Sequence, residues 1–216
     1  SSDVCSSDLH LATTVPGTVT LGTPIDLSSG NLLLEPQEAM HLSGTISGNP
    51  YAGLEVSGYG RTVTLSGNNT YSGTSYASNR ALLIAASDTA LGSSQANLSL
   101  GGDLTFTSAA PTVGGLVAGD PLDIPSLELF DPAVITLAGA SGTVLTINNS
   151  LAGSYSSFWG DIVESGSTGS LVKTGPGTQW LGGYNGLTGG TTITYQGHTI
   201  RSEEHTSELQ SHVRIS

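Results

Sequence analysis

Apolar and polar residues alternate along most of the chain, in short runs separated by turn residues. Examples are TVTLSG (62–67), VITLAG (134–139) and TVLTINNSL (143–151). Alternation with a period of two places every second side chain on one face of a strand. The longest helix candidate without glycine, NLLLEPQEAM (31–40), is interrupted by Pro36. The pattern therefore predicts an all-β chain with little helix and strands of about four to six residues.

Two distant segments share one arrangement of apolar residues and glycines. They are LEVSGYGRTVTLSGNNTYSGTS (54–75) and LVKTGPGTQWLGGYNGLTGGTT (171–192). Aligned residues lie 116 positions apart; these pairs are Leu65 and Leu181, Gly67 and Gly183, Asn69 and Asn185, Ser72 and Thr188, Gly73 and Gly189, and, upstream, Ile46 and Ile162. Gly58 and Gly60 match Gly175 and Gly177 at a spacing of 117.

This internal repeat predicts a solenoid, in which each rung of two or three short strands stacks on an identical rung. A single rung cannot bury its own apolar face, whereas a stack pairs the backbones and closes a continuous core. Glycine suits the turns between faces because it adopts a positive φ without steric cost. Asn68 and Asn69 suit turns because Asn tolerates the left-handed region. Stacked Asn side chains could also form a hydrogen-bonded ladder.

The repeated residues resemble the repeat associated with autotransporter passenger domains, whose usual form is close to L-x-K-x-G-x-G-x-L-x-L-x-G-x-N-T-Y-x-G-x-T. GNNTYSG (67–73) matches the centre of that pattern. The second copy departs from it, because Gly186 and Leu187 stand where Thr and Tyr are usual. ALLIAASDTALG (81–92) resembles the family's continuation, an apolar strand that leads into an Ala-Leu-Gly turn. Together these matches cover about 55 residues.

The resemblance implies a right-handed parallel β-helix, secreted across the outer membrane and displayed on the surface of a Gram-negative-type bacterium. In such proteins a C-terminal membrane β-barrel anchors the passenger. The implied partners are therefore the rest of the same polypeptide, namely further repeats and that barrel. At ~20–25 residues per rung, the chain would form roughly eight rungs. The implied function is a structural stalk or spacer that is not an enzyme.

Both ends of the chain resemble translated adapter sequence from DNA-sequencing libraries. RSEEHTSELQS (201–211) is one translation of a common adapter, and SSDVCSSDL (1–9) translates the reverse complement of the same oligonucleotide. We therefore expect residues 1–9 and 201–216 to be adapter-derived, and residues 10–200 to form the β-helix passenger segment. The alternative is a natural tail that carries two histidines.

Charge and cysteine content narrow the functions open to the chain. Lys and Arg total 5 and Asp and Glu total 17, so the formal net charge is -12. Without the expected adapter residues the net charge is about -9, and Cys5, His205 and His212 are no longer candidates for disulfide or metal chemistry. Nucleic-acid binding requires basic side chains that the chain lacks. No apolar run approaches the ~20 residues of a membrane-spanning helix, and no signal-peptide pattern is visible.

Parallel β-helices also host enzymes that act on polysaccharides, so a polysaccharide hydrolase is one alternative function. Hydrolysis requires two carboxylates across a groove; the candidates are Asp120, Asp123, Glu128 and Asp131 in residues 119–132, and Asp161 and Glu164 in residues 160–164. The structural interpretation is that Asp beside Pro or Gly caps turns. A lyase acting on polyuronates would need a basic groove, which three basic residues cannot make.

Two other kinds of site have weak signals. Loop carboxylates bind calcium, and Asp120, Asp123 and Asp131 could contribute to such a site. His41 and His198 have no evident partners for nucleophilic catalysis, and we expect His41 to be a strand residue. We therefore predict no catalytic, cofactor-binding or metal-binding residues and no cofactor.

An aromatic cluster supports a further alternative, a surface adhesin that binds glycans or host surfaces through loops. Tyr155, Phe158 and Trp159 lie together in SYSSFWGD (154–161), and a carbohydrate could stack on them. The structural interpretation is that Phe158 and Trp159 fill the core or cover a loop. Trp180 stands where the repeat usually has a small strand residue, so we expect it to pack on the outside or into a corner.

Overall fold

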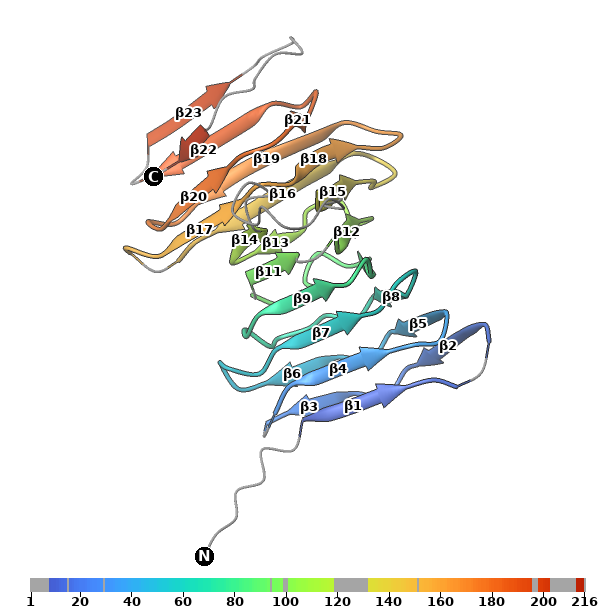
Figure 1. Cartoon of the computed structure of the whole chain (residues 1–216). Coiled ribbons are helices and arrows are strands. Elements are labelled where there is room, and N and C mark those ends of the chain that lie inside the picture. The colour runs from blue at the N-terminus through green and yellow to red at the C-terminus, as the bar shows by residue number, and fades with distance from the viewer. Residues whose placement is uncertain are drawn as a thin grey trace, which may run out of the picture.

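The chain folds as a parallel β-solenoid, in which short strands stack in successive layers (Figure 1). This computed structural model describes residues 8–14, 16–28, 30–93, 95–98, 101–118, 132–150, 152–195, 198–202 and 213–215. No helix occurs in those residues. The predicted all-β solenoid is therefore confirmed.

Two long faces run the length of the solenoid. The first face contains, in order of pairing, β1 (Leu9–Ala12), β4 (Leu32–Glu35), β7 (Leu54–Ser57), β9 (Ser75–Ser78), β11 (Gln95–Leu98), β14 (Gly115–Ala118), β17 (Tyr155–Phe158), β20 (Thr178–Leu181) and β24 (Val213–Ile215). The second face contains β2 (Thr18–Leu21), β5 (Ala39–Leu42), β8 (Thr62–Leu65), β10 (Leu82–Ala85), β12 (Asp103–Phe106), β15 (Val134–Leu137), β18 (Asp161–Glu164) and β21 (Asn185–Gly186).

A third face has strands in the first rungs and again in the C-terminal half of the described chain. β3 (Ile25–Leu27) pairs with β6 (Ile46–Gly48) at one end. In the C-terminal half the pairing order is β13 (Thr112–Val113), β16 (Thr143–Asn148), β19 (Gly169–Thr174), β22 (Thr191–Tyr195) and β23 (His198–Ser202). Between these groups, backbone hydrogen bonds continue without strands, as from the Thr70 N–H to the Ile46 carbonyl at 2.9 Å.

The register shows how much chain each rung uses. Leu32 pairs with Leu54, and Leu54 with Ser75, so these rungs take 22 and 21 residues. More residues separate β14 from β17, because Ala118 pairs with Phe158, 40 positions later. All described strand pairs are parallel except β22–β23 and β20–β24. The predicted adapter boundaries at residues 9 and 201 stay a prediction.

The alternation in the sequence places alternate side chains in a common interior. In β8, Val63 and Leu65 are fully buried, while Thr62 and Thr64 face outward and are partly exposed. Stacked strands align such positions in columns; one column on the first face contains Val56, Ala77, Leu98, Ala118, Phe158 and Leu181. The core is therefore continuous along the solenoid, and its burial favours the stacked state.

The two repeat copies do not occupy equivalent positions. Leu65 lies on β8 of the second face, whereas Leu181 lies on β20 of the first face and stacks in the column of Val56. The two copies therefore match in sequence although they lie on different faces of the solenoid. Every strand-to-turn corner of a solenoid requires apolar alternation followed by a turn, so segments from different faces can match in sequence.

The Asn residues of GNNTYSG have a role that differs from the predicted one. Among described residues other than glycine, a positive φ occurs at Asn79 and Arg80, and so at neither Asn68 nor Asn69. Asn69 is instead buried, and it bonds to backbone groups on two other rungs rather than to a ladder of Asn side chains. The prediction for the turn glycines holds at Gly58 and Gly175, whose φ angles are 123° and 75°.

Candidate functional site

The two carboxylates of GDIVE lie on β18 and contact the next rung. Oδ1 of Asp161 accepts a hydrogen bond from the Tyr184 N–H at 2.8 Å. Glu164 accepts hydrogen bonds from the N–H groups of Gly169 and Thr188 at 2.7 and 3.0 Å, and from the Thr188 hydroxyl. Both side chains therefore hold rungs together, which is a structural role but not the turn capping that the sequence suggested.

The hydrogen bonds to Glu164 also set its acidity. Burial by itself would raise the pKa of this carboxyl. The backbone N–H groups of Thr188 and Gly169 and the Thr188 hydroxyl stabilise the charged form and bring the pKa below its ordinary value. A carboxyl with a lowered pKa is a poor general acid at neutral pH, so Glu164 does not resemble the acid of a glycoside hydrolase.

The remaining carboxylate candidates fall elsewhere. Asp120, Asp123, Glu128 and Asp131, which were the candidates for hydrolysis and calcium binding, lie outside the described residues. His205 and His212 also lie outside them. Within the described part of the chain, no three His, Cys, Asp or Glu side chains lie together in a group that could hold a metal ion.

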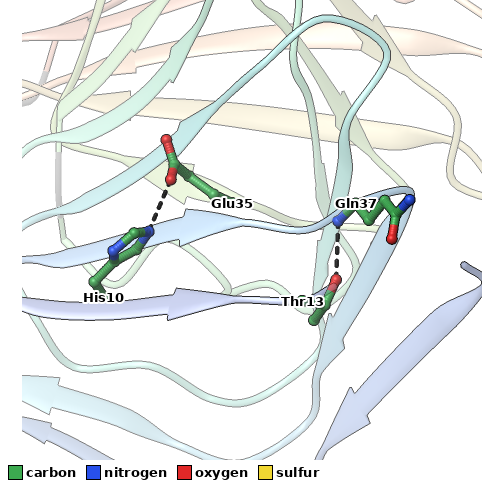
Figure 2. Close-up of polar contacts among 4 residues, drawn as sticks. All are labelled: His10, Thr13, Glu35 and Gln37. Atoms are coloured by element: carbon green, nitrogen blue, oxygen red, sulfur yellow. Dashed lines mark hydrogen bonds and ion pairs between the residues drawn. The ribbon is translucent and has the colours of Figure 1, made fainter. Parts of the chain in front are cut away.

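Two described histidines join neighbouring rungs. His41 is on β5, where its Nε2 lies 2.7 Å from Oγ of Ser66, so it is the strand residue expected from the sequence. Figure 2 shows a contact on the first face, where Nε2 of His10 on β1 lies 2.8 Å from Oε2 of Glu35. In the same view the Gln37 N–H donates to the Thr13 hydroxyl at 2.9 Å. His198 belongs to β23, opposite Tyr195.

Polar side chains in the interior are the feature that sequence reasoning missed. Asn69 accepts from the Ile46 N–H at 2.7 Å and donates to the Ala90 carbonyl at 2.6 Å. Gln179 is fully buried and bonds to the backbone of Leu116. The signal was present in TQWL (178–181), because Gln179 shares the inward phase of Leu181.

Lys173 is a charged residue buried in the interior of the solenoid. It is 2 % exposed on β19, between Ile147 and Ile193 in the register. Its Nζ donates to the carbonyls of Thr174 and Gly175 at 2.7 and 2.9 Å. Burial lowers the pKa of Lys173 from its ordinary value. Lys173 forms no ion pair within the described residues.

The aromatic cluster divides between the core and the surface. Phe158 is fully buried, whereas Tyr155 is 60 % exposed and Trp159 is partly exposed. Phe158 therefore fills the core as the structural interpretation expected. Trp180 faces outward from β20, and its ring centroid lies 6.2 Å from that of Trp159 with an interplanar angle of 38°. This outward packing of Trp180 confirms the expectation from the sequence.

Comparisons with known proteins give no relative from which a function could be carried over. No family model matches the chain, and no curated protein or solved structure matches it at a significant level. Within the described residues, no helix has the length and apolar character needed to cross a membrane.

Proposed function

We propose that residues 10–200 form a structural spacer within the passenger of an autotransporter, outside a bacterial cell, and that they have no enzymatic activity. The observation that carries the proposal is the unbroken parallel pairing of the second face from β2 to β21. Eight rungs at ~4.8 Å span roughly 35 Å. Such a rod holds whatever lies beyond it away from the cell. The repeat pattern of residues 54–75 and 171–192 supports the choice of passenger.

The first rung supports stacking on further repeats of the same polypeptide. Leu11 of β1 is partly exposed, whereas Leu34, its partner on β4, is completely buried. A rung stacked on β1 would bury Leu11 and pair the open strand edge. The partner that fits this end of the rod is therefore another rung of the same kind.

The contacts of the carboxylates support a role without catalysis. Asp161 and Glu164 are committed to hydrogen bonds with the next rung. If the segment were a hydrolase that uses Asp161, the protein would release reducing sugar from polysaccharides, and Asp161→Asn would abolish the release. The spacer proposal predicts no release from the parent protein.

Location is tested by labelling intact cells with antibodies raised against residues 10–200. The proposal predicts labelling without permeabilisation and loss of the label when intact cells are treated with protease. Label that appears only after the cells are permeabilised would contradict it.

Removal of whole rungs tests the mechanical part of the proposal. Deletion of residues 54–74 removes one turn and brings Ser75 opposite Leu32, where Leu54 was. We expect the shortened protein to keep its β circular dichroism spectrum and its surface display. Deletion of residues 54–65 is the control, because it removes two strands and leaves the remainder of the turn. The proposal fails if both deletions unfold the protein equally.

A further inference from the structure

We infer that the outer surface of β17 and β20 is a binding face for a neutral polysaccharide. This aromatic face consists of Tyr155, Ser157, Trp159, Thr178 and Trp180. β17 and β20 are neighbours on the first face (Figure 1), with Tyr155 opposite Thr178 and Ser157 opposite Trp180. The inference goes beyond the spacer role and does not depend on it.

The direction of these side chains follows from what is buried. Ser156 and Phe158 point into the core from β17, so Tyr155 and Ser157 point out. Gln179 and Leu181 point into the core from β20, so Thr178 and Trp180 point out. Four members of the aromatic face are on β17 and β20, and Trp159 directly follows the last residue of β17. The paired strands hold these binding groups at fixed positions.

The Trp159 ring is seated against a glycine. A Cβ atom placed on Gly182 would lie 2.2 Å from Cε3 of Trp159, so only glycine leaves room for the ring at that position. Trp180 packs beside the ring at 6.2 Å between centroids. Tyr155 begins β17, four residues before Trp159, which is about 13 Å in an extended chain. This length can accommodate more than one pyranose ring.

The lack of charge on the aromatic face favours a neutral polysaccharide over an acidic one. None of its five side chains is charged, although the chain carries a net charge of -12. An acidic polysaccharide would be repelled by the net negative charge of the chain. Aromatic rings pack on the apolar C–H faces of neutral sugars, while the hydroxyls of Ser157 and Thr178 can bond to sugar hydroxyls. β24 pairs with the edge of β20, so it extends the sheet rather than covering its outer surface.

Tryptophan fluorescence tests the inference directly, because Trp159 and Trp180 are the two tryptophans of the chain. The full chain is titrated separately with cellohexaose, mannohexaose and maltohexaose as neutral probes, and with polygalacturonate as an acidic one. We expect at least one neutral probe to quench or shift the emission saturably, and polygalacturonate to have no effect. Tyr155→Ala should weaken this binding roughly tenfold, while Tyr51→Ala, which removes a tyrosine that is 90 % exposed elsewhere, should leave it unchanged.

A second variant tests whether binding depends on the position of the Trp159 ring and not only on its presence. Gly182→Ala keeps every aromatic side chain but displaces the Trp159 ring, so it should also weaken binding by tenfold or more. The inference is overturned if no neutral probe changes the emission, if polygalacturonate binds more tightly than the neutral probes, or if Tyr155→Ala and Tyr51→Ala bind equally well.

Discussion

The side-chain amide of Gln179 binds both backbone groups of Leu116, a residue 63 positions earlier in the chain. The Leu116 N–H donates to Oε1 of Gln179 at 2.9 Å, and Nε2 of Gln179 donates to the Leu116 carbonyl at 2.9 Å. β17 lies between β14 and β20 in the first face, and it pairs with β14 in the described register only at Ala118 and Phe158. Gln179 therefore supplies hydrogen bonds where the strand ladder is incomplete.

Replacement of Gln179 by Leu should destabilise the protein strongly. The N–H and carbonyl of Leu116 are completely buried and would each lose a hydrogen bond, at a cost of about 1–3 kcal/mol per group. We expect the free energy of unfolding to fall by about 2–5 kcal/mol in urea titrations followed by circular dichroism. Thr178→Val, on the outward side of the same strand, is the control and should change it by less than about 0.5 kcal/mol. Equal effects of the two substitutions would contradict the role given to Gln179.

The two asparagines of GNNTYSG should differ in their sensitivity to substitution. Asn69→Ala leaves the Ile46 N–H and the Ala90 carbonyl without their partner, so we expect a loss of about 2–5 kcal/mol. Asn68 is exposed and bonds to the Thr89 hydroxyl at 3.2 Å, so Asn68→Ala should cost about 0.5 kcal/mol. Thermal unfolding of both variants measures the difference. A similar drop in Tm for both variants would show that the buried hydrogen bonds of Asn69 do not explain why the motif needs asparagine at this position.

Glycines with close neighbours should tolerate alanine less well than open ones. A Cβ on Gly73 would lie 2.2 Å from the Ala52 carbonyl oxygen, a backbone atom that cannot move without disturbing the rung below. Gly73→Ala should therefore destabilise by about 1–3 kcal/mol or more. At Gly22 the nearest atom is Oγ of Ser43 at 3.5 Å and φ is not positive, so Gly22→Ala should be neutral or stabilising. Denaturant midpoints compare the two, and a larger loss at Gly22 would contradict the packing argument.

Lys173 should make stability depend on alkaline pH. Because burial lowers its pKa in the folded state, the unfolded chain binds more protons between that pKa and the ordinary value of 10.5. The free energy of unfolding therefore rises as the pH increases from the folded-state pKa of Lys173 towards 10.5. Lys173→Met should raise the free energy of unfolding at pH 7 by about 1–3 kcal/mol, and this advantage should shrink as pH approaches 10.5.

Substitution of Lys173 by Arg is the matched control for this pH effect. Arg stays charged throughout the range, so this variant should be less stable than the parent at every pH. Urea titrations of the three proteins between pH 7 and about 10.5 measure the difference. A difference between Lys173→Met and the parent that does not vary with pH would contradict the assignment.

The candidate site was only partly predictable from the sequence. The outward position of Trp180 and the burial of Phe158 follow from alternation along single strands, so local pattern was sufficient. The contacts of Glu164 with Thr188 and of Trp159 with Gly182 join different rungs. Such contacts depend on how many residues each rung uses, and that number changes where Ala118 pairs with Phe158.

The sequence by itself determined that the chain is an all-β solenoid with glycines at its corners, because strand alternation and turn preference act over a few residues. Only the tertiary structure decided which residues share a column, since stacking register depends on the length of every intervening loop. For this reason Leu181 lies in line with Val56 and not with Leu65. The partners of the interior polar residues also depend on this register. The structural role of Gln179 and Asn69 became clear only when the backbone groups that they bond to had been placed beside them.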